Sequence, residues 1–329
     1  MQKIMQDYSE KYLPFFSSRF LQLIILPTEQ CNFRCVYCYE SYSAGRIEDK
    51  VVEGIKNLLI ARSKDLDVLS IGWFGGEPTL AYDVVVDLMK FIKYDCPHNP
   101  EMRLISDIST NGYLLTADRI RELVSLGVTH FQVTFDGDKD QHDKLRILIG
   151  NRPTFNAIWK NVLVAKNSEI DFTMTIRIHV NKNNVESVRR FIYMAAQNLS
   201  GDHRFRFFIR ELSQLGGNND QFLPIFTNNR EIEEILKDLR SEASNLGLEL
   251  YKEGSYNYVD ICYAAMPNSF VIRSNGEVNK CTVALNDGKN RVGKLLRDGT
   301  LQLDKEKMIW WIRGMFSDDK DQLACPLLP

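Results

Sequence analysis

The chain has 329 residues, of which 44% are hydrophobic and 26% are charged, and its formal net charge is -2 at pH 7. This length allows one large domain, or a large and a small one, and the composition is that of an ordinary globular protein. The small net charge argues against a nucleic-acid-binding surface. No apolar run approaches the roughly 20 residues that cross a bilayer, and residues 1–20 lack the apolar core of a signal peptide.

Strand-like segments alternate with amphipathic helices from Leu21 to Ile209. Apolar side chains recur at helical spacing after each of the first five segments, and Thr116 and Gly127 are expected to cap the third helix. Strands that alternate with helices form βαβ units, so the sequence predicts an α/β fold with a parallel sheet. The expected strands are Leu21–Leu26, Val68–Trp73, Arg103–Ser109, His130–Thr134, Phe172–His179 and Phe205–Ile209.

The pattern changes after the sixth strand. A turn-rich piece, Gly216–Asp220, precedes a helix-like stretch, Glu231–Leu246. Further on, Phe270–Arg273 and Glu277–Lys280 flank the turn Ser274-Asn275-Gly276, which predicts a β-hairpin. We therefore expect four parts: an N-terminal lead (1–20), the main α/β domain (21–210), a bridging region (211–255) and a C-terminal region (256–329).

Three cysteines directly follow the first strand. Cys31, Cys35 and Cys38 have the spacing C-x3-C-x2-C, and thiolates so close in sequence can converge on a soft metal centre, usually an iron–sulfur cluster or zinc. Structural zinc requires a fourth ligand nearby, and the next candidates are the distant Cys96 and His98. The pattern favours a four-iron cluster with one open iron. Free thiols or a zinc clip are the simpler alternatives.

This motif, with an aromatic Tyr37 before its last cysteine, resembles that of the radical S-adenosylmethionine (SAM) enzymes. The resemblance implies a partial (β/α)6 barrel, a 4Fe-4S cluster on Cys31, Cys35 and Cys38, and SAM bound at the open iron, with Tyr37 near its adenine. In that family an electron from the cluster cleaves SAM to methionine and a deoxyadenosyl radical, which abstracts a hydrogen atom from the substrate. A flavodoxin or a ferredoxin is the expected electron donor.

Two further motifs follow the second and third strands. Gly75-Gly76-Glu77-Pro78 resembles the family motif that binds the methionine amino group of SAM; the alternative is a helix-entry turn with Pro78 at its first position. In Ser109-Thr110-Asn111-Gly112, the resemblance places Ser109 or Asn111 near the ribose or carboxylate of SAM, and a simple turn is the alternative.

The fourth and fifth strands carry the remaining candidates of the main domain. Phe135-Asp136-Gly137, followed by His142, Asp143 and Arg146, resembles a segment of radical SAM peptide maturases. It makes Asp136 the candidate for contact with ribose or substrate and for catalysis, or only a cap of the next loop. Arg177 resembles the basic residue that meets the SAM carboxylate, unless it faces outward. Ligands of such sheets bind at the C-terminal strand ends, where these motifs fall.

A second cysteine group, Cys262, Cys281 and Cys325, lies in the C-terminal region. With Gly276, its C-x(n)-G-x4-C spacing resembles the opening of a SPASM domain, which carries auxiliary iron–sulfur clusters in many peptide-modifying radical SAM enzymes. Buried structural thiols are the alternative. The family pattern has a cysteine where this chain has Gln322, so we expect this region to be truncated or degenerate and auxiliary clusters to be partial or absent.

The sequence thus predicts a radical SAM enzyme that modifies a side chain or backbone carbon of a ribosomally made peptide or protein, by a thioether, a C–C crosslink or epimerisation. An odd number of cysteines, seven, favours the reducing cytoplasm, and neither nucleic acid nor a membrane is an expected partner. One alternative is a sulfatase-maturating enzyme, but those usually carry an Asp where this chain has Thr282 after Cys281. Another is a non-catalytic iron–sulfur or zinc-binding scaffold, which would lack a SAM site.

Overall fold

The computed structural model describes residues 16–251, 261–317 and 319–327. The described chain divides into two compact units, and strand β3 (Arg103–Thr110) runs from the first into the second. The first unit takes its described residues from Met1–Gln30, Ser43–Ser106 and Gly254–Pro329, and the second consists of Cys31–Tyr42 and Asp107–Glu253. The four parts expected from the sequence remain a prediction.

In the first unit, parallel strands meet an antiparallel hairpin. Strand β1 (Phe20–Ile25) pairs in parallel with β2 (Val68–Trp73) on one side and with β8 (Ser269–Ile272) on the other. The strand order β11-β10-β9-β8-β1-β2 therefore joins the N-terminal and C-terminal parts of the chain in one sheet. The antiparallel members are β9 (Glu277–Asn279), β10 (Arg291–Leu295) and β11 (Leu301–Leu303).

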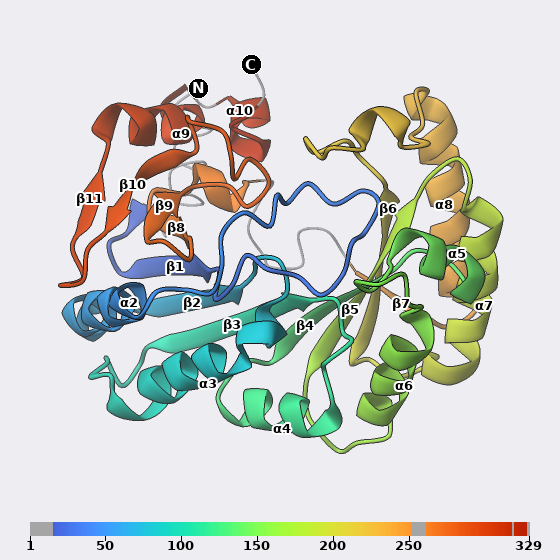
Figure 1. Cartoon of the computed structure of the whole chain (residues 1–329), viewed down its shortest axis with the longest axis horizontal. Coiled ribbons are helices and arrows are strands. Elements are labelled where there is room, and N and C mark those ends of the chain that lie inside the picture. Colours follow the sequence, from blue (N-terminus) through green and yellow to red (C-terminus); the bar gives the residue numbers. More distant parts are fainter. Residues whose placement is uncertain (1–15, 252–260, 318, 328–329) are drawn as a thin grey trace, which may run out of the picture. The chain divides into compact units, whose positions relative to one another are not determined.

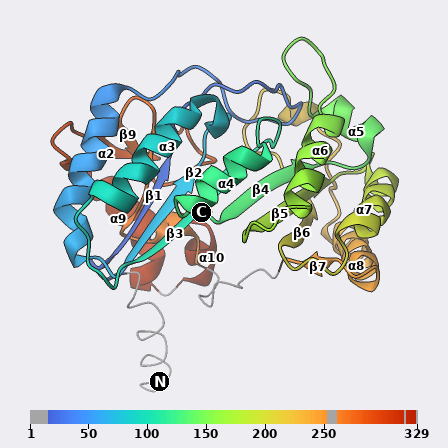
Figure 2. The ribbon, with the colours of Figure 1, turned by 90° about the horizontal axis from the view of Figure 1, so that it is seen from below.

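Helices α2 (Asp49–Arg62) and α3 (Tyr82–Lys90) follow β1 and β2 and cover one face of them, as Figures 1 and 2 show. Five of the six residues of β2 are buried, which is typical of a parallel strand covered on both faces. Two C-terminal helices, α9 (Lys305–Ser317) and α10 (Lys320–Ala324), complete this unit.

The second unit continues the alternation of strands and helices. After β3 come β4 (His130–Phe135), β5 (Thr173–Val180), β6 (Phe205–Glu211) and β7 (Glu249–Leu250), each parallel to the strand before it. Figure 1 shows α6, α7 and α8 on the outer side of β5, β6 and β7. The helices are α4 (Ala117–Ser125), α5 (Lys139–Leu145), α6 (Phe155–Lys166), α7 (Val185–Leu199) and α8 (Asn229–Asn245).

Side chains of β4, β5 and β6 alternate between two environments, as the two-residue period of a strand requires. On one face, apolar side chains such as Phe131, Ile176 and Phe207 are buried. The other face, which we call the polar face, is only partly buried. Its members are His130, Gln132, Thr134, Thr173, Thr175, Arg177, His179, Arg206, Phe208 and Arg210.

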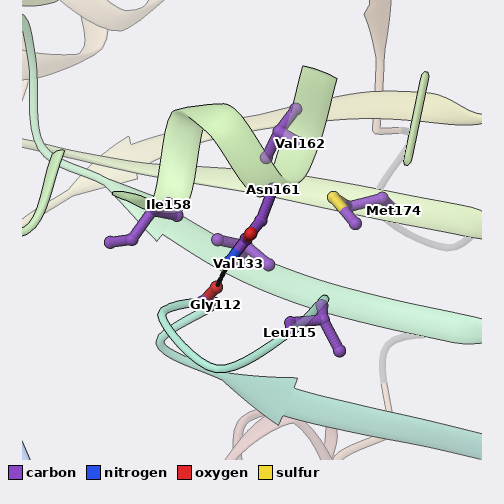
Figure 3. A pocket seen from close by; sticks show the side chains of 7 residues that line it. All are labelled: Gly112, Leu115, Val133, Ile158, Asn161, Val162 and Met174. Carbon is purple, nitrogen blue, oxygen red and sulfur yellow. Dashed lines mark hydrogen bonds between the residues drawn. The ribbon is translucent and has the colours of Figure 1, made fainter. Parts of the chain in front are cut away.

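A small apolar pocket lies on the buried face, beneath α6 (Figure 3). The polar side chain in its lining, Asn161, donates from Nδ2 to the carbonyl oxygens of Gly112 and Tyr113, at 2.9 and 3.1 Å. A packing gap explains this pocket better than a ligand site, because its walls are core side chains and its amide is already hydrogen-bonded. The lining residues are Gly112, Leu115, Val133, Ile158, Asn161, Val162 and Met174.

The predicted α/β fold with a parallel sheet and a C-terminal hairpin is confirmed. The Thr116 hydroxyl accepts a hydrogen bond from the backbone N–H of Arg119, and Gly127, just past α4, has a φ of +100°. The predicted helix Glu231–Leu246 corresponds to α8, but the sequence did not predict that β8 would pair with β1, or that β7 would follow α8 and pair with β6. Among the described helices, none is long and apolar enough to cross a membrane.

Candidate functional site

The loop with the first three cysteines, Cys31–Tyr42, is fixed to the segment after α5. The backbone N–H groups of Arg34 and Val36 donate to the carbonyl oxygens of Ile147 and Leu145, at 2.8 and 3.0 Å. These bonds give the loop a defined path although it has no regular secondary structure of its own.

Hydrogen-bond donors are directed at two of its three sulfur atoms. The Sγ of Cys31 accepts from the backbone N–H of Phe33 at 3.3 Å. Burial raises the pKa of Cys38, and hydrogen bonds from the Tyr42 side chain and the backbone of Glu40 oppose this rise. Burial likewise raises the pKa of Cys35 to about 11. Donors to sulfur are features of iron–sulfur sites, so this donor set fits such a cluster.

As the side chains stand, no group of three Cys, His, Asp or Glu in the described ranges is arranged to hold a metal ion. This holds for the cysteine loop and for the second cysteine group alike.

Tyr37 joins the cysteine loop to the ends of two strands through a buried polar network. Its hydroxyl donates to Oδ2 of Asp136 and accepts from Nη1 of Arg146, the latter at 2.7 Å. The other carboxylate oxygen, Oδ1, accepts from Nδ1 of His179 at 3.1 Å. Tyr37 and Asp136 are 99 residues apart in the sequence. The network thus sets the position of the aromatic ring that precedes Cys38.

Asp136 is completely buried. Burial acts to raise the pKa of Asp136, but the hydrogen bond from His179 and the charges of His179 and Arg146 outweigh it and hold the pKa well below its usual range. Both carboxylate oxygens have partners inside the protein. This geometry suits a residue that positions Tyr37, while a catalytic role for Asp136 remains a prediction.

His142 lies beneath this network, with Nε2 at 3.1 Å from the hydroxyl of Thr154. Burial, and after it the charge of Arg146, lowers the pKa of His142 to about 3. The histidine is therefore neutral in the folded protein at neutral pH. It fits a structural hydrogen-bonding role within α5.

The low pKa of His142 predicts a loss of stability in mild acid. Between its ordinary pKa of about 6.5 and the folded value, the unfolded chain binds one proton more than the folded one. We expect the free energy of unfolding to fall with decreasing pH below about 6.5, with a slope that approaches about 1.4 kcal/mol per unit. Urea unfolding of the wild type and of His142→Gln, over the same pH series, measures the difference. Equal slopes in both proteins would contradict it.

Two of the predicted SAM contacts, Ser109 and Asn111, lie at the end of β3 and directly after it. Asn111 donates from Nδ2 to Oδ1 of Asn32 in the cysteine loop at 2.8 Å. Ser109 accepts from Nε2 of Gln132, its register neighbour on β4, at 3.3 Å. Asn111 thereby lies against the cysteine loop, and Ser109 lies beside the polar face.

Arg177 lies within the polar face, next to Thr134 on β4 and Phe208 on β6. Its Nε is buried and has no hydrogen-bond partner in the described residues. Arg177 is therefore partly buried on the polar face. It does not extend outward into bulk solvent.

In the first unit, the Gly75–Pro78 motif packs against the chain just before Cys31. Gly75 has a φ of +111°, and a Cβ on Gly76 would lie 2.4 Å from the carbonyl oxygen of Gln30. Pro78 is the first residue of a short 3-10 helix (Pro78–Ala81), and Oε1 of Glu77 accepts from the backbone N–H of Thr79 at 3.0 Å. The helix-entry geometry is thus present. The same close approach leaves no room for side chains at the two glycines.

Cys262, Cys281 and Cys325 come near one another in the first unit. Burial raises the pKa of Cys262 to about 11, and the charges of Cys281 and Cys325 add to the rise. The backbone N–H of Cys262 donates to the carbonyl oxygen of Leu323 at 2.8 Å, and Sγ of Cys281 accepts from the N–H of Val283 at 3.3 Å. Their proximity is compatible both with cluster ligation and with a thiol-lined core.

A buried lysine and a buried ion pair lie near these motifs, and neither was predicted from the sequence. Lys280 is fully buried and donates from Nζ to the carbonyl oxygens of Met266 and Ser269, at 2.5 and 2.7 Å. Glu29, just before the cysteine loop, forms a buried ion pair with Arg273 and accepts from the Ser274 hydroxyl at 3.0 Å. A lysine in a hairpin and a glutamate after a strand are normally exposed, so only the tertiary structure reveals them.

The turn-rich piece after β6 lies against the cysteine loop in the second unit. Asn219 donates from Nδ2 to the carbonyl oxygen of Val36 at 3.0 Å. A Cβ on Gly217 would lie 2.7 Å from the carbonyl oxygen of Cys38. Glycine at position 217 is therefore required for this close approach.

Replacement of Gly217 by valine should displace this turn and break the bond from Asn219. We expect a loss of about 1–3 kcal/mol in the free energy of unfolding, typical of an overpacked site. Amide hydrogen exchange should show faster exchange in residues 31–42. Gly288→Val is the control, because an added Cβ there has no atom within 4 Å. Equal effects of the two substitutions would refute the close-contact explanation.

The profile of the Radical SAM superfamily matches residues 25–192, which is more than half of the 329-residue chain. The chain belongs to the radical SAM superfamily. The cofactors of this superfamily are SAM and a 4Fe-4S cluster, and the matched range contains the cysteine loop, the Gly75–Pro78 motif, Asp136 and Arg177.

Two curated relatives act on proteins or peptides, to judge from their names. A PqqA peptide cyclase of Bradyrhizobium diazoefficiens is 27% identical over 177 residues, which are 53% of this chain and 43% of that protein. A cysteine-type anaerobic sulfatase-maturating enzyme of Clostridium novyi is 25% identical over 288 residues, 79% of this chain and 73% of that protein. The chain spans less than half the length of the first curated relatives that it matches.

Among solved structures, native anSMEcpe with bound AdoMet and the Kp18Cys peptide superimposes with a TM-score of 0.67. The match has 20% sequence identity and covers 88% of this chain and 80% of that one. At this identity the likeness shows a radical SAM fold. It supports the predicted architecture beyond the matched residues 25–192.

Proposed function

We propose that this chain is a radical SAM enzyme that modifies a side chain or backbone carbon of a ribosomally made peptide or protein. The observation that carries the proposal is the anchored cysteine loop, in which donors face the sulfur atoms of Cys31 and Cys38 and a buried network fixes Tyr37. A thioether, a C–C crosslink or an epimerised residue is the expected product.

Each candidate residue has a part in this proposal. Cys31, Cys35 and Cys38 would hold a 4Fe-4S cluster, which supplies the electron that cleaves SAM. Tyr37 would lie near the adenine, held by Asp136 and Arg146. The remaining SAM-binding candidates are Gly75, Gly76, Glu77, Pro78, Ser109, Asn111 and Arg177, and a flavodoxin or ferredoxin in the cytoplasm is the proposed electron donor.

The relatives support a peptide or protein substrate. One is named as a peptide cyclase and another as a sulfatase-maturating enzyme, and anSMEcpe was solved with a bound peptide. These proteins differ in the bond that they make or break. The class of substrate is therefore better supported than the type of modification.

A sulfatase-maturating activity is the second candidate, favoured by the 79% coverage of this chain in that comparison. The position after Cys281 argues against it. Thr282 stands there in place of an Asp, and its hydroxyl lies 2.7 Å from the hydroxyl of Tyr263. A threonine so placed has no carboxylate to accept a proton from a substrate cysteine or serine.

Auxiliary iron–sulfur clusters on Cys262, Cys281 and Cys325 are a further part of the proposal. The three cysteines would supply at most one cluster with three protein ligands. Iron content after reconstitution addresses this directly: about eight irons per chain indicate an auxiliary cluster and about four indicate the core cluster alone.

The test of the proposed function is reductive cleavage of SAM by the reconstituted, dithionite-reduced protein. We expect 5′-deoxyadenosine from the wild type and from Cys96→Ala, since Cys96 lies outside the candidate site and contacts Ser63. The variant with Cys31, Cys35 and Cys38 replaced by alanine should form neither cluster nor product. A wild type that binds zinc and yields no deoxyadenosine would establish the scaffold alternative.

A further inference from the structure

Three arginines share the polar face of β5 and β6 in the second unit. They are Arg177 on β5 and Arg206 and Arg210 on β6, where His179 is the register partner of Arg210 and Phe208 that of Arg177. Arg177 and Arg210 are thus diagonal neighbours on the same face, near the C-terminal ends of their strands. Ligands of parallel α/β sheets bind at that end.

Only one of the three has an acidic partner. The Nε of Arg206 lies 3.6 Å from Oε1 of Glu249 on β7. The guanidinium groups of Arg177 and Arg210 form no hydrogen bond or ion pair with any residue that the structure describes. Arg210 lies over the ring of Phe208 at 5.9 Å, and the Nε of Arg177 is buried without a partner.

In the part of the chain that the structure describes, no carboxylate forms an ion pair with Arg177 or Arg210. The acidic side chain that acts on Arg177 is Asp136, whose oxygens already accept from Tyr37 and His179. The register places Arg177 and Arg210 as diagonal neighbours, and burial and the adjacent charge of Arg210 both lower the pKa of Arg177. Both side chains are partly buried, and guanidinium groups that have no acidic partner in the described residues are free to bind the anion of a ligand.

We propose that Arg210, beside Arg177 on this face, binds a carboxylate of the substrate, which is therefore a peptide with an aspartate or glutamate beside the residue that is modified. A guanidinium accepts a carboxylate through two parallel hydrogen bonds, and an anion would remove the repulsion between the two arginines. This inference rests on the proposed function, because it specifies the substrate of the same site.

The carboxylate of SAM has the same chemistry and is the other source of an anion. The sequence resemblance implies that Arg177 binds the SAM carboxylate, and it implies no role for Arg210. In this proposal Arg210 binds the peptide. A substrate carboxylate and the SAM carboxylate therefore predict different effects of an Arg210 substitution. SAM binding and peptide binding are therefore measured separately.

The experiment uses the reconstituted holoenzyme saturated with SAM and two synthetic peptide pools. The pools are identical except that one contains Asp and Glu where the other contains Asn and Gln. We expect the wild type to retain the acidic pool about tenfold better than the amide pool, and Arg210→Gln to lose this preference. Arg206→Gln, on the same strand and face but paired with Glu249, is the matched control and should keep it. Calorimetry should show that Arg210→Gln binds SAM with the affinity of the wild type.

Two results would overturn the inference. One is a wild type that retains both pools equally while binding SAM normally. The other is an Arg210→Gln variant that loses affinity for SAM but not for decarboxylated SAM, since the carboxylate is then that of the cofactor. Failure of the proposed function would give a different result: the wild type would form no deoxyadenosine, whatever its preference among peptides.

Discussion

Replacement of Arg273 by alanine is expected to lower the free energy of unfolding by about 3–5 kcal/mol, the cost of leaving one partner of a buried ion pair alone. The side chains of Arg273 and Glu29 are only 10% and 4% exposed. Nε of Arg273 lies 3.2 Å from Oε1 of Glu29, and Nη1 also donates to the carbonyl oxygen of Leu285 at 3.0 Å. The substitution therefore leaves the buried carboxylate of Glu29 without its cationic partner, with only Ser274 as a donor among the described residues, and removes one of the donors to the carbonyl of Leu285. Urea unfolding followed by circular dichroism measures the loss.

Arg291 provides the control for this prediction. It lies on β10 and pairs with Glu277 on the neighbouring strand β9 at 3.1 Å, but its side chain is 60% exposed. Arg291→Ala should cost less than about 1 kcal/mol, as exposed pairs do. A second comparison is the double substitution Glu29→Met with Arg273→Met, which removes both charges and should restore part of the stability. If Arg273→Ala cost no more than Arg291→Ala, burial of the pair would not explain its contribution.

Replacement of Asp136 by alanine should have an effect of similar size in the second unit. Arg146 and His179 would lose the negative charge that they surround, and the Tyr37 hydroxyl would lose its acceptor. We expect a loss of about 3–5 kcal/mol in the free energy of unfolding. Because Tyr37 stands between Cys35 and Cys38, less iron should be incorporated on reconstitution. Chemical unfolding and iron analysis measure the two effects.

Asp138→Ala is the control for this prediction. It removes an acidic side chain near the end of β4 but leaves the hydrogen bonds of Asp136 to Tyr37 and His179 in place. Asp138 caps α5, accepting from the backbone N–H of Gln141 at 3.2 Å, and its side chain is 26% exposed. Loss of such a cap costs about 1 kcal/mol. Iron content should stay at the wild-type level in this variant. An Asp136→Ala protein as stable and as rich in iron as Asp138→Ala would rule out the proposed role of the network.

The strands of the main domain were predictable because their information is local. Val68–Trp73 is an apolar run of strand length, and the structure has β2 at these same residues. The alternation on β4 and β5 reflects one buried and one polar face, and this period is visible in the sequence. Thr116 was recognisable as a cap because its side chain acts on a backbone group three residues away.

The pairing of distant segments was not predictable in the same way. Phe270–Arg273 is predicted as the first strand of a hairpin, and nothing in these residues indicates the parallel pairing of β8 with β1. Asp136 and Tyr37 were each identified, but as separate ligand contacts and not as partners. The partners of Lys280 and Arg273 are carbonyl groups and a carboxylate that only the fold brings near. A single sequence carries no record of such contacts.

The position of β8 has a consequence for how the chain folds as it is made. The hydroxyl of Ser269 on β8 contacts Gln22 on β1 across 247 residues of sequence. During synthesis, one edge of β1 therefore stays unpaired until β8, which is near the end of the sequence, has left the ribosome. Contacts so distant slow folding, and an open strand edge invites pairing with other chains. Nascent chains of this protein should therefore need chaperone protection until the last third of the molecule has emerged.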